Sequence, residues 1–214
     1  MSLSRLLVIG GTGLVGRAVL QHAAARHVVE EIVALVRRDP GPRHSTKISY
    51  RVVDFNQLDA VADAFAVDAV ISTLGTTARQ TPDPAAYRRI EVDLPLEVAT
   101  RAHAAGATRH ALVSSIGASP DAGSIYLRQK AELERGIEAL GWARSIVARP
   151  SVLLGQRDRL RPMERIGAAI GRLAPLRYRS IDADTVAAAL VAALLRGGPA
   201  IEVLDNVTLH EGIR

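Results

Sequence analysis

The sequence predicts an α/β fold: a doubly wound, mostly parallel sheet with a small C-terminal lid segment. Up to Pro150, short apolar runs alternate with longer amphipathic segments, which is typical of βαβ units. A glycine-rich turn follows the first apolar run, and polar residues follow the ends of several others. After Pro150 the alternation stops. The length fits one domain, 1–214, in which 151–214 supplies the lid.

Each predicted strand is a short apolar run bounded by turn residues. Leu6–Ile9 is apolar throughout, as expected for a strand buried on both faces of a parallel sheet. By the same reasoning the other strands are Ile32–Val36, Ile48–Val53, Ala69–Leu74, His110–Ser114, Ser145–Arg149 and Ile201–Leu204, with a short extended stretch at Tyr178–Ile181.

The predicted helices are segments in which apolar residues recur every three or four positions. Leu14–His27 follows the glycine-rich turn, and Pro84–Gly106 ends at a glycine suited to a C-terminal cap. We expect Glu91, Asp93 and Glu97 to lie on a solvated face of that helix. The other helices are Asp59–Phe65, Ser124–Gly141, Met163–Leu173 and Asp184–Arg196, and Ser151–Pro162 is expected to be a loop.

Composition excludes several classes of protein. The 214 residues contain no cysteine, which rules out disulfides and thiolate chemistry. The six histidines lack metal-site spacing, so no metal is expected. The net charge of +5 comes from scattered arginines, densest at 157–165, and no reading motif accompanies them. This indicates a bias toward arginine rather than nucleic-acid binding.

The sequence also suggests where the protein works. No apolar run approaches the roughly 18 residues of a transmembrane helix. The first strand begins almost at Met1, which leaves no room for a signal peptide. We therefore expect a cytoplasmic monomer or homodimer that binds a small-molecule substrate, without nucleic-acid or membrane partners.

The glycine-rich turn is the first candidate binding feature. Gly10, Gly13 and Gly16 stand between a strand and a helix, where backbone N–H groups can hold a pyrophosphate. Gly10 would allow the tight turn, Gly13 the approach of the phosphates, and Gly16 the packing of helix on sheet. The other contacts expected from this turn are Thr12, Leu14 and Val15.

Arg37 and Arg38 end the second predicted strand. NAD-specific sites usually carry an acid at this point, for the ribose 2′-hydroxyl. Since a guanidinium suits a 2′-phosphate, the sequence predicts NADP(H) as the cofactor. The alternative is that both arginines are solvated loop residues. Asp54 follows the third strand and is placed either to accept a hydrogen bond from adenine or to cap a turn.

Tyr126 and Lys130 are the candidate catalytic pair, because a spacing of four puts them on one face of a helix. With two lysines in the chain, this spacing is expected by chance about 0.04 times. An ammonium group near a phenol favours the phenolate, which makes Tyr126 a usable general acid. Ser114 and Ser115 end the preceding strand, where a hydroxyl can orient a carbonyl oxygen. The alternative is a surface Tyr–Lys pair that stabilises the helix.

The segments GGTGLVGR, ALVRRD, TLGTT, VSSIGAS, YLRQKAELE and ARPSVLLG, in this order, resemble the short-chain dehydrogenase/reductase superfamily. The chain is most similar to its atypical NAD(P)H-binding branch, which includes the Tat-interacting-protein-like oxidoreductases. The resemblance implies a Rossmann-type fold and a catalytic set of Ser115, Tyr126 and Lys130. Further cofactor-binding residues expected are Thr73, Leu74, Gly75, Ser114, Lys130, which would hold the nicotinamide ribose, and Pro150, beside the nicotinamide.

One departure from the superfamily pattern concerns its asparagine before the fifth strand, which is absent; Asp93 lies in that region. The leading function is an NADPH-dependent oxidoreductase acting on a small carbonyl or alcohol. The first alternative is a non-catalytic NADP(H)-binding regulatory protein. A sugar-nucleotide epimerase is less favoured, because about 60 residues after Pro150 leave little room for a nucleotide-sugar domain.

Overall fold

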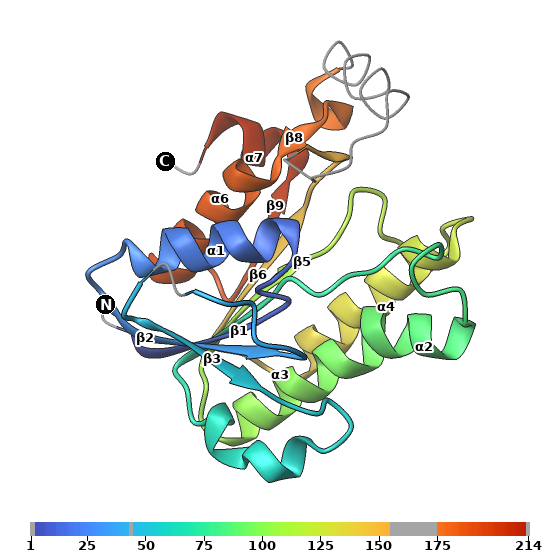
Figure 1. The fold of residues 1–214 in the computed structure, drawn as a ribbon. Coiled ribbons are helices and arrows are strands. Elements are labelled where there is room, and N and C mark those ends of the chain that lie inside the picture. Colours follow the sequence, from blue (N-terminus) through green and yellow to red (C-terminus); the bar gives the residue numbers. More distant parts are fainter. Residues whose placement is uncertain (1–2, 43–44, 155–174, 213–214) are drawn as a thin grey trace.

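A computed structural model describes residues 3–42, 45–154 and 175–212. Its central sheet has seven strands in the order β3-β2-β1-β4-β5-β6-β9, and all of its pairings are parallel (Figure 1). The predicted doubly wound Rossmann fold is therefore confirmed. The strands are β1 (Leu3–Ile9), β2 (Val29–Val36), β3 (Ile48–Val52), β4 (Ala69–Ser72), β5 (Arg109–Val113), β6 (Arg144–Arg149) and β9 (Ile201–Asp205).

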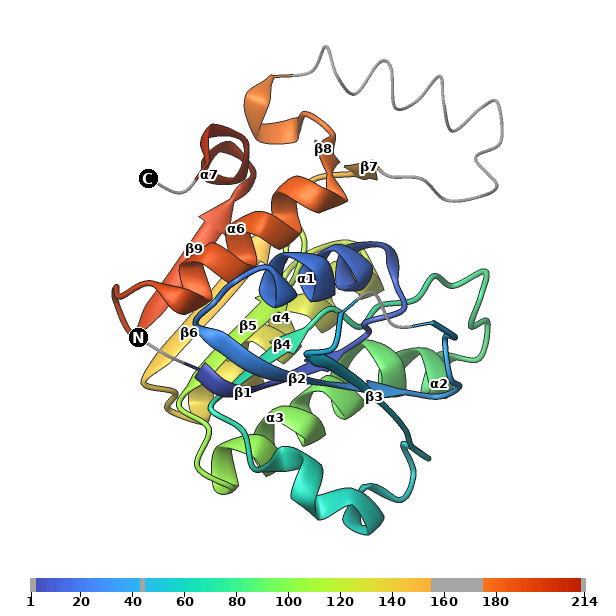
Figure 2. The ribbon, with the colours of Figure 1, turned by 60° about the vertical axis from the view of Figure 1, so that its left-hand side comes forward.

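Helices cover both faces of the sheet (Figure 1, Figure 2). Leu6 and Val8 of β1 belong to one hydrophobic cluster and Leu7 and Ile9 to the other. This explains the uninterrupted apolar run, because each successive side chain meets a helix layer. The layers consist of α1 (Leu14–Ala24) and α6 (Ala183–Leu195) on one face, and of α3 (Leu94–Ala104) and α4 (Ile125–Ala139) on the other.

Part of the segment predicted as a C-terminal lid belongs to the main sheet and its helix layer. Its helix α6 covers the sheet beside α1, and its strand β9 pairs with β6. The predicted helix Met163–Leu173 and the arginine group at 157–165 lie outside the described residues. The short elements are β7 (Leu153–Leu154), β8 (Ile181–Asp182), α7 (Asn206–Glu211) and the 3-10 helices η1 (Leu58–Phe65) and η3 (Leu176–Tyr178).

The helix predicted over Pro84–Gly106 is interrupted by a π-helical turn that the sequence did not predict. It runs through α2 (Pro84–Arg88), a π-helical turn at Arg89–Asp93 (η2) and α3. Gly106, with φ +103°, ends it as predicted, and Ala107 N donates to Ala102 O across the cap. A π turn is wider than an α turn, so it changes which side chains face inward. No helix among the described residues is long and apolar enough to span a bilayer.

The strand order reverses between β1 and β4. In sheets of this type ligands bind outside the carboxyl ends of the strands at that point. Gly10 follows β1 and Thr73 follows β4, so the predicted glycine turn and groove residues meet there. Arg37 after β2 and Ser114 after β5 lie at the same edge, because all of these strands are parallel.

Candidate functional site

The glycine turn has the close packing that its sequence predicts. Gly10 has φ +79°, and a Cβ on it would lie 2.7 Å from Thr73 Oγ1. A Cβ on Gly16 would lie 2.1 Å from the Gly10 carbonyl oxygen, so α1 can approach the turn only with glycine there. Gly13 precedes the first turn of α1, which carries no acidic side chain. The positive end of this helix is thus open to a phosphate group.

The neighbouring residues of the turn divide into two kinds. Thr12 is exposed and Leu14 is half-buried, whereas the Val15 side chain packs into the hydrophobic core. Only the backbone of Val15 can therefore face a ligand.

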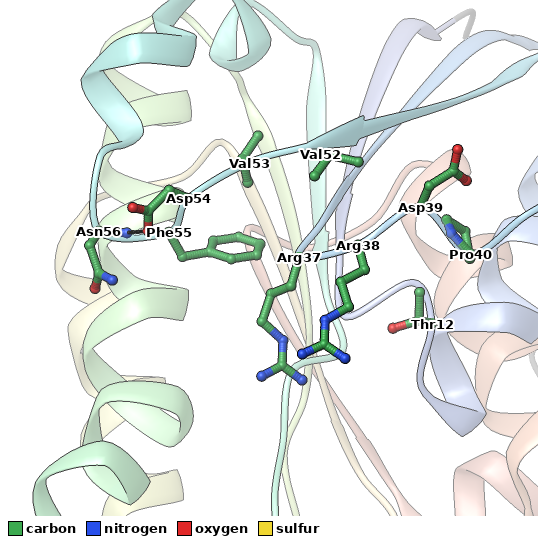
Figure 3. A pocket seen from close by; sticks show the side chains of 10 residues that line it. All are labelled: Thr12, Arg37, Arg38, Asp39, Pro40, Val52, Val53, Asp54, Phe55 and Asn56. Atoms are coloured by element: carbon green, nitrogen blue, oxygen red, sulfur yellow. Dashed lines mark hydrogen bonds between the residues drawn. The ribbon is translucent and has the colours of Figure 1, made fainter.

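A cavity of about 870 Å³ lies beside this turn (Figure 3). Its lining includes residues from three separate strand ends, namely Thr12, Arg37, Arg38 and Asp54. The side chains of Arg37 and Arg38 extend side by side between Phe55 and Thr12 (Figure 3). The remaining lining residues are Asp39, Pro40, Val52, Val53, Phe55 and Asn56.

Arg37 and Arg38 form no ion pair within the described part of the chain. Asp54 accepts a hydrogen bond from Asn56 N at 2.9 Å, so its carboxylate caps a turn while it also lines the cavity. Phe55 and Asn56 were missed by sequence reasoning, although their place directly after Asp54 was the available signal.

The loop after β4 is held against the end of β1. Thr73 donates through both its N and its Oγ1 to the Ile9 carbonyl oxygen, at 3.0 and 2.9 Å, and so ties the ends of β4 and β1 together. Leu74 packs against the hydrophobic core, and Gly75 lies beside the Glu91 carboxylate. The residues predicted to line the groove thus lie at the switch point.

Tyr126 and Lys130 share a face of α4, as their spacing predicts. Lys130 is only 3% exposed, and its Nζ atom lies 5.6 Å from the centre of the Tyr126 ring. This burial argues against the alternative of a surface pair. Ser115 is half-buried in the loop after β5, where Gly117 lies next to Leu127 of α4. The loop that carries Ser115 thus lies beside the first turns of α4, which carry Tyr126 and Lys130.

The two serines have different surroundings. Ser114 is buried, and its hydroxyl donates to the Glu134 carboxylate, which also accepts two hydrogen bonds from Arg149. The Ser115 hydroxyl donates a long hydrogen bond, 3.3 Å, to the neighbouring Ile116 carbonyl oxygen, and no other partner of this hydroxyl is found in the described part of the chain. Ile116 N donates to the Pro150 carbonyl oxygen, so Pro150 supports the loop that carries Ser115. Of the two hydroxyls, that of Ser115 is the one free to meet a substrate.

The expectation of a solvated face on the long helix is wrong for Glu91. Its side chain is fully buried, with Oε2 2.8 Å from Lys130 Nζ and Oε1 accepting a 2.6 Å hydrogen bond from Thr76 N. Asp93 and Glu97 do lie toward the surface, where they pair with arginines. The carboxylate that contacts Lys130 is thus Glu91, on the π turn, whereas Asp93 pairs with Arg88.

A second phenol lies near the first. Burial, followed by the charges of Glu91 and Tyr126, raises the pKa of Tyr87 to about 12. Tyr87 is therefore protonated at neutral pH and poorly suited to proton transfer. Among the described residues, no group of three metal-ligating side chains occurs.

Comparison with known proteins identifies the family. The model of the NAD dependent epimerase/dehydratase family matches residues 6–175, which is most of the chain. The chain belongs to this family. The family lies within the short-chain dehydrogenase/reductase superfamily that the sequence motifs resemble.

Two relatives of this family member come from fungi. Protein fmp52, mitochondrial, of Emericella nidulans is 31% identical over 175 residues, covering 77% of this chain and 73% of that protein. Protein FMP52, mitochondrial, of Eremothecium gossypii is 35% identical over 152 residues, covering 71% and 67%. Since the names of both place them in mitochondria, these relatives overturn the expected cytoplasmic location.

Solved structures show the same fold. The Bordetella bronchiseptica enzyme WbmG in complex with NAD has a TM-score of 0.70 and 17% identity, over 96% of this chain and 73% of its own. A UDP-glucose 4-epimerase from Thermotoga maritima, with UDP-glucose, has a TM-score of 0.71 and 15% identity, over 94% and 76%. At these identities the likeness is one of fold.

Proposed function

We propose that this family member is an NADP(H)-dependent oxidoreductase of the atypical short-chain dehydrogenase/reductase type, acting on a small carbonyl compound or the corresponding alcohol. The observation that carries the proposal is the pairing, on one face of α4, of the half-buried Tyr126 with the buried Lys130. It lies at the same edge of the sheet as the glycine turn of Gly10.

The preference for NADP(H) rests on the cavity beside the turn. Arg37 and Arg38 place two guanidinium groups there, at the end of β2, where an NAD site usually has an acid. Neither arginine has a carboxylate partner in the described part of the chain, so both charges are available to a phosphate dianion.

When bound, the dinucleotide supplies a hydride to the carbonyl carbon or accepts one from the alcohol. In the direction of reduction, Tyr126 gives its phenolic proton to the carbonyl oxygen, so that hydride and proton together form the alcohol. Ser115 donates a hydrogen bond that orients the same oxygen. Lys130 stabilises the phenolate left on Tyr126 and has donors to spare for the ribose hydroxyls.

A sugar-nucleotide substrate is less well supported. The solved structures that contain NAD or UDP-sugars are at most 18% identical to this chain, so their likeness is one of fold and does not extend to the substrate. The regulatory alternative shares the dinucleotide site but requires no proton transfer by Tyr126.

The decisive experiment titrates the protein with NADPH and NADH, then follows nicotinamide absorbance with a panel of small carbonyl compounds. We expect tighter binding of NADPH, and turnover that falls roughly 10²- to 10⁴-fold in Tyr126→Phe. Tyr87→Phe is the matched control, because it removes the neighbouring phenol and should change turnover only a few-fold. Binding without turnover on any compound would favour the regulatory alternative, and equal loss in both variants would refute Tyr126 as the acid.

A further inference from the structure

Glu91 is a fully buried carboxylate that contacts two parts of the site. One of its oxygens faces the Lys130 ammonium at 2.8 Å, and the other accepts a hydrogen bond from Thr76 N, in the loop that follows β4. Both side chains of the ion pair are almost inaccessible to water. Isolated buried charges are very unfavourable, so each of these two groups needs the other.

The π turn at Arg89–Asp93 gives Glu91 this position in the middle of a long helix. Short π-helical turns inside α-helices occur frequently at functional sites. Such a turn changes the direction of a side chain from the one that a regular α-helix would give it. The cost of inserting the turn, and of burying a charge, indicates a role beyond filling the core.

We propose that Glu91 is a positioning residue: it holds Lys130 in register with Tyr126, joins it to the loop of the cofactor groove, and sets the charge that the Tyr126 phenol experiences. This inference rests on the proposed function. An ammonium group has three N–H donors. With the ammonium group held 2.8 Å from Glu91 Oε2, its donors remain available to the phenol and to a ribose hydroxyl.

The charge of Glu91 has a definite effect on proton transfer. Within residues 3–42, 45–154 and 175–212, the titratable groups around the Tyr126 phenol are Lys130 on its own helix, Tyr87 on α2 and Glu91 on the π turn. The negative charge of Glu91 offsets the positive charge of Lys130 next to this phenol. Removing that negative charge leaves Lys130 unopposed, which favours the phenolate.

The first test compares Glu91→Gln with Glu91→Asp. In Glu91→Gln we expect NADPH to bind about tenfold more weakly, and the alkaline limb of the pH profile of reduction to move down by about one pH unit. Glu91→Asp keeps the charge, so its alkaline limb should lie near that of the wild type.

Glu202→Gln is the matched control, because Glu202 pairs with the buried Arg144 at the start of β6, at the opposite edge of the sheet. It should lower the melting temperature while leaving NADPH affinity and the pH profile unchanged. If Glu91→Gln behaves like this control, the positioning role is overturned.

A second measurement needs no turnover and no cofactor. Ultraviolet titration of the wild type against Tyr126→Phe isolates the Tyr126 phenol, and Glu91→Gln should form the phenolate at lower pH. Should that variant fail to fold, Glu91→Gln/Lys130→Met removes both charges and should form the phenolate at lower pH than Lys130→Met alone. Coincident titrations would refute the inference, whereas failure of the wild type to bind NADPH would refute only the proposed function.

Discussion

Gly10 and Thr73 touch across the switch point of the sheet, where only a glycine hydrogen fits between them. A Cβ on Gly10 would lie 2.7 Å from the Oγ1 atom of Thr73 and equally close to the Leu74 backbone nitrogen. The turn that would receive the pyrophosphate is thus built directly against the loop that leads to Thr76 and Glu91.

Gly10→Ala is expected to destabilise the protein by about 2–4 kcal/mol and to abolish NADPH binding, because it adds a clash to an unfavourable backbone conformation. Gly141→Ala is the control. Gly141 has φ +73° but open space around it, so only the backbone cost of about 1–2 kcal/mol applies. Urea unfolding and NADPH titration measure both effects. Equal losses of stability in the two variants would show that the contact with Thr73 is unimportant.

Arg37→Asp is expected to weaken NADPH binding by roughly 10- to 150-fold, the worth of a charge-assisted contact, while NADH binding changes little. Arg26→Asp makes the same change in net charge on an exposed residue just after α1, away from the cavity, and serves as the control. Isothermal titration with both dinucleotides gives the ratio of the NADPH affinity to the NADH affinity in each variant. If NADPH binding falls to the same extent in both variants, Arg37 acts only through net charge.

The two adjacent serines should separate stability from catalysis. Ser115→Ala is expected to lower the turnover number about 10²- to 10³-fold with little loss of stability, because it removes a donor to the substrate oxygen. Ser114→Ala should lower the free energy of unfolding by about 1–3 kcal/mol, since it removes the buried hydrogen bond that Ser114 donates to Glu134. Its turnover should remain within a few-fold of the wild type. The reverse pattern would assign the catalytic hydroxyl to Ser114.

His110 should make the stability depend on pH. It is fully buried beside Trp142, neither ring nitrogen has a hydrogen-bond partner among the described residues, and burial lowers its pKa to about 3. In the unfolded chain its pKa is about 6.5, so below that pH the unfolded state takes up a proton that the folded state refuses. The stability that neutral His110 provides is present above pH 6.5. It falls by up to about 1.4 kcal/mol per pH unit as the pH drops toward 3.

Denaturant unfolding at pH 7 and pH 5 checks this dependence, with His110→Leu as the comparison. In the variant, the free energy of unfolding should change less between pH 5 and pH 7, because the contribution of His110 is removed. His210→Leu makes the same substitution at a half-buried histidine of α7 and serves as a second comparison. Identical slopes in the wild type and His110→Leu would contradict the assignment.

The sheet was predictable because its strands are buried on both faces, which leaves short apolar runs such as Leu6–Ile9 in the sequence. The glycine turn and the Tyr126–Lys130 spacing were predictable for a similar reason, since each depends on a few residues close together in the chain. The pairing of β9 (Ile201–Asp205) with β6 was not predictable, because about 50 residues separate the two strands and no local pattern shows where the chain rejoins the sheet.

Glu91 shows where prediction from sequence ended. In a regular helix over Pro84–Gly106, acidic residues at 91, 93 and 97 are expected to face water. The π turn breaks that regularity, and its formation depends on packing against α4 and on the Lys130 ammonium group. Because Lys130 lies on another helix, α4, no pattern in the sequence around Glu91 reveals their contact.

The pairing of α1 with α6 also bears on how the protein is made. The two helices pack side by side, and His22 of α1 meets Asp184 of α6 at 2.9 Å (Figure 1). α1 ends at Ala24, but α6 begins only at Ala183. At a synthesis rate of about 5–20 residues per second, the side of α1 that meets α6 stays uncovered for roughly 10–30 s on the ribosome. A nascent chain of this protein therefore exposes an apolar helix surface for most of its synthesis, and a chain truncated before α6 would keep that surface exposed.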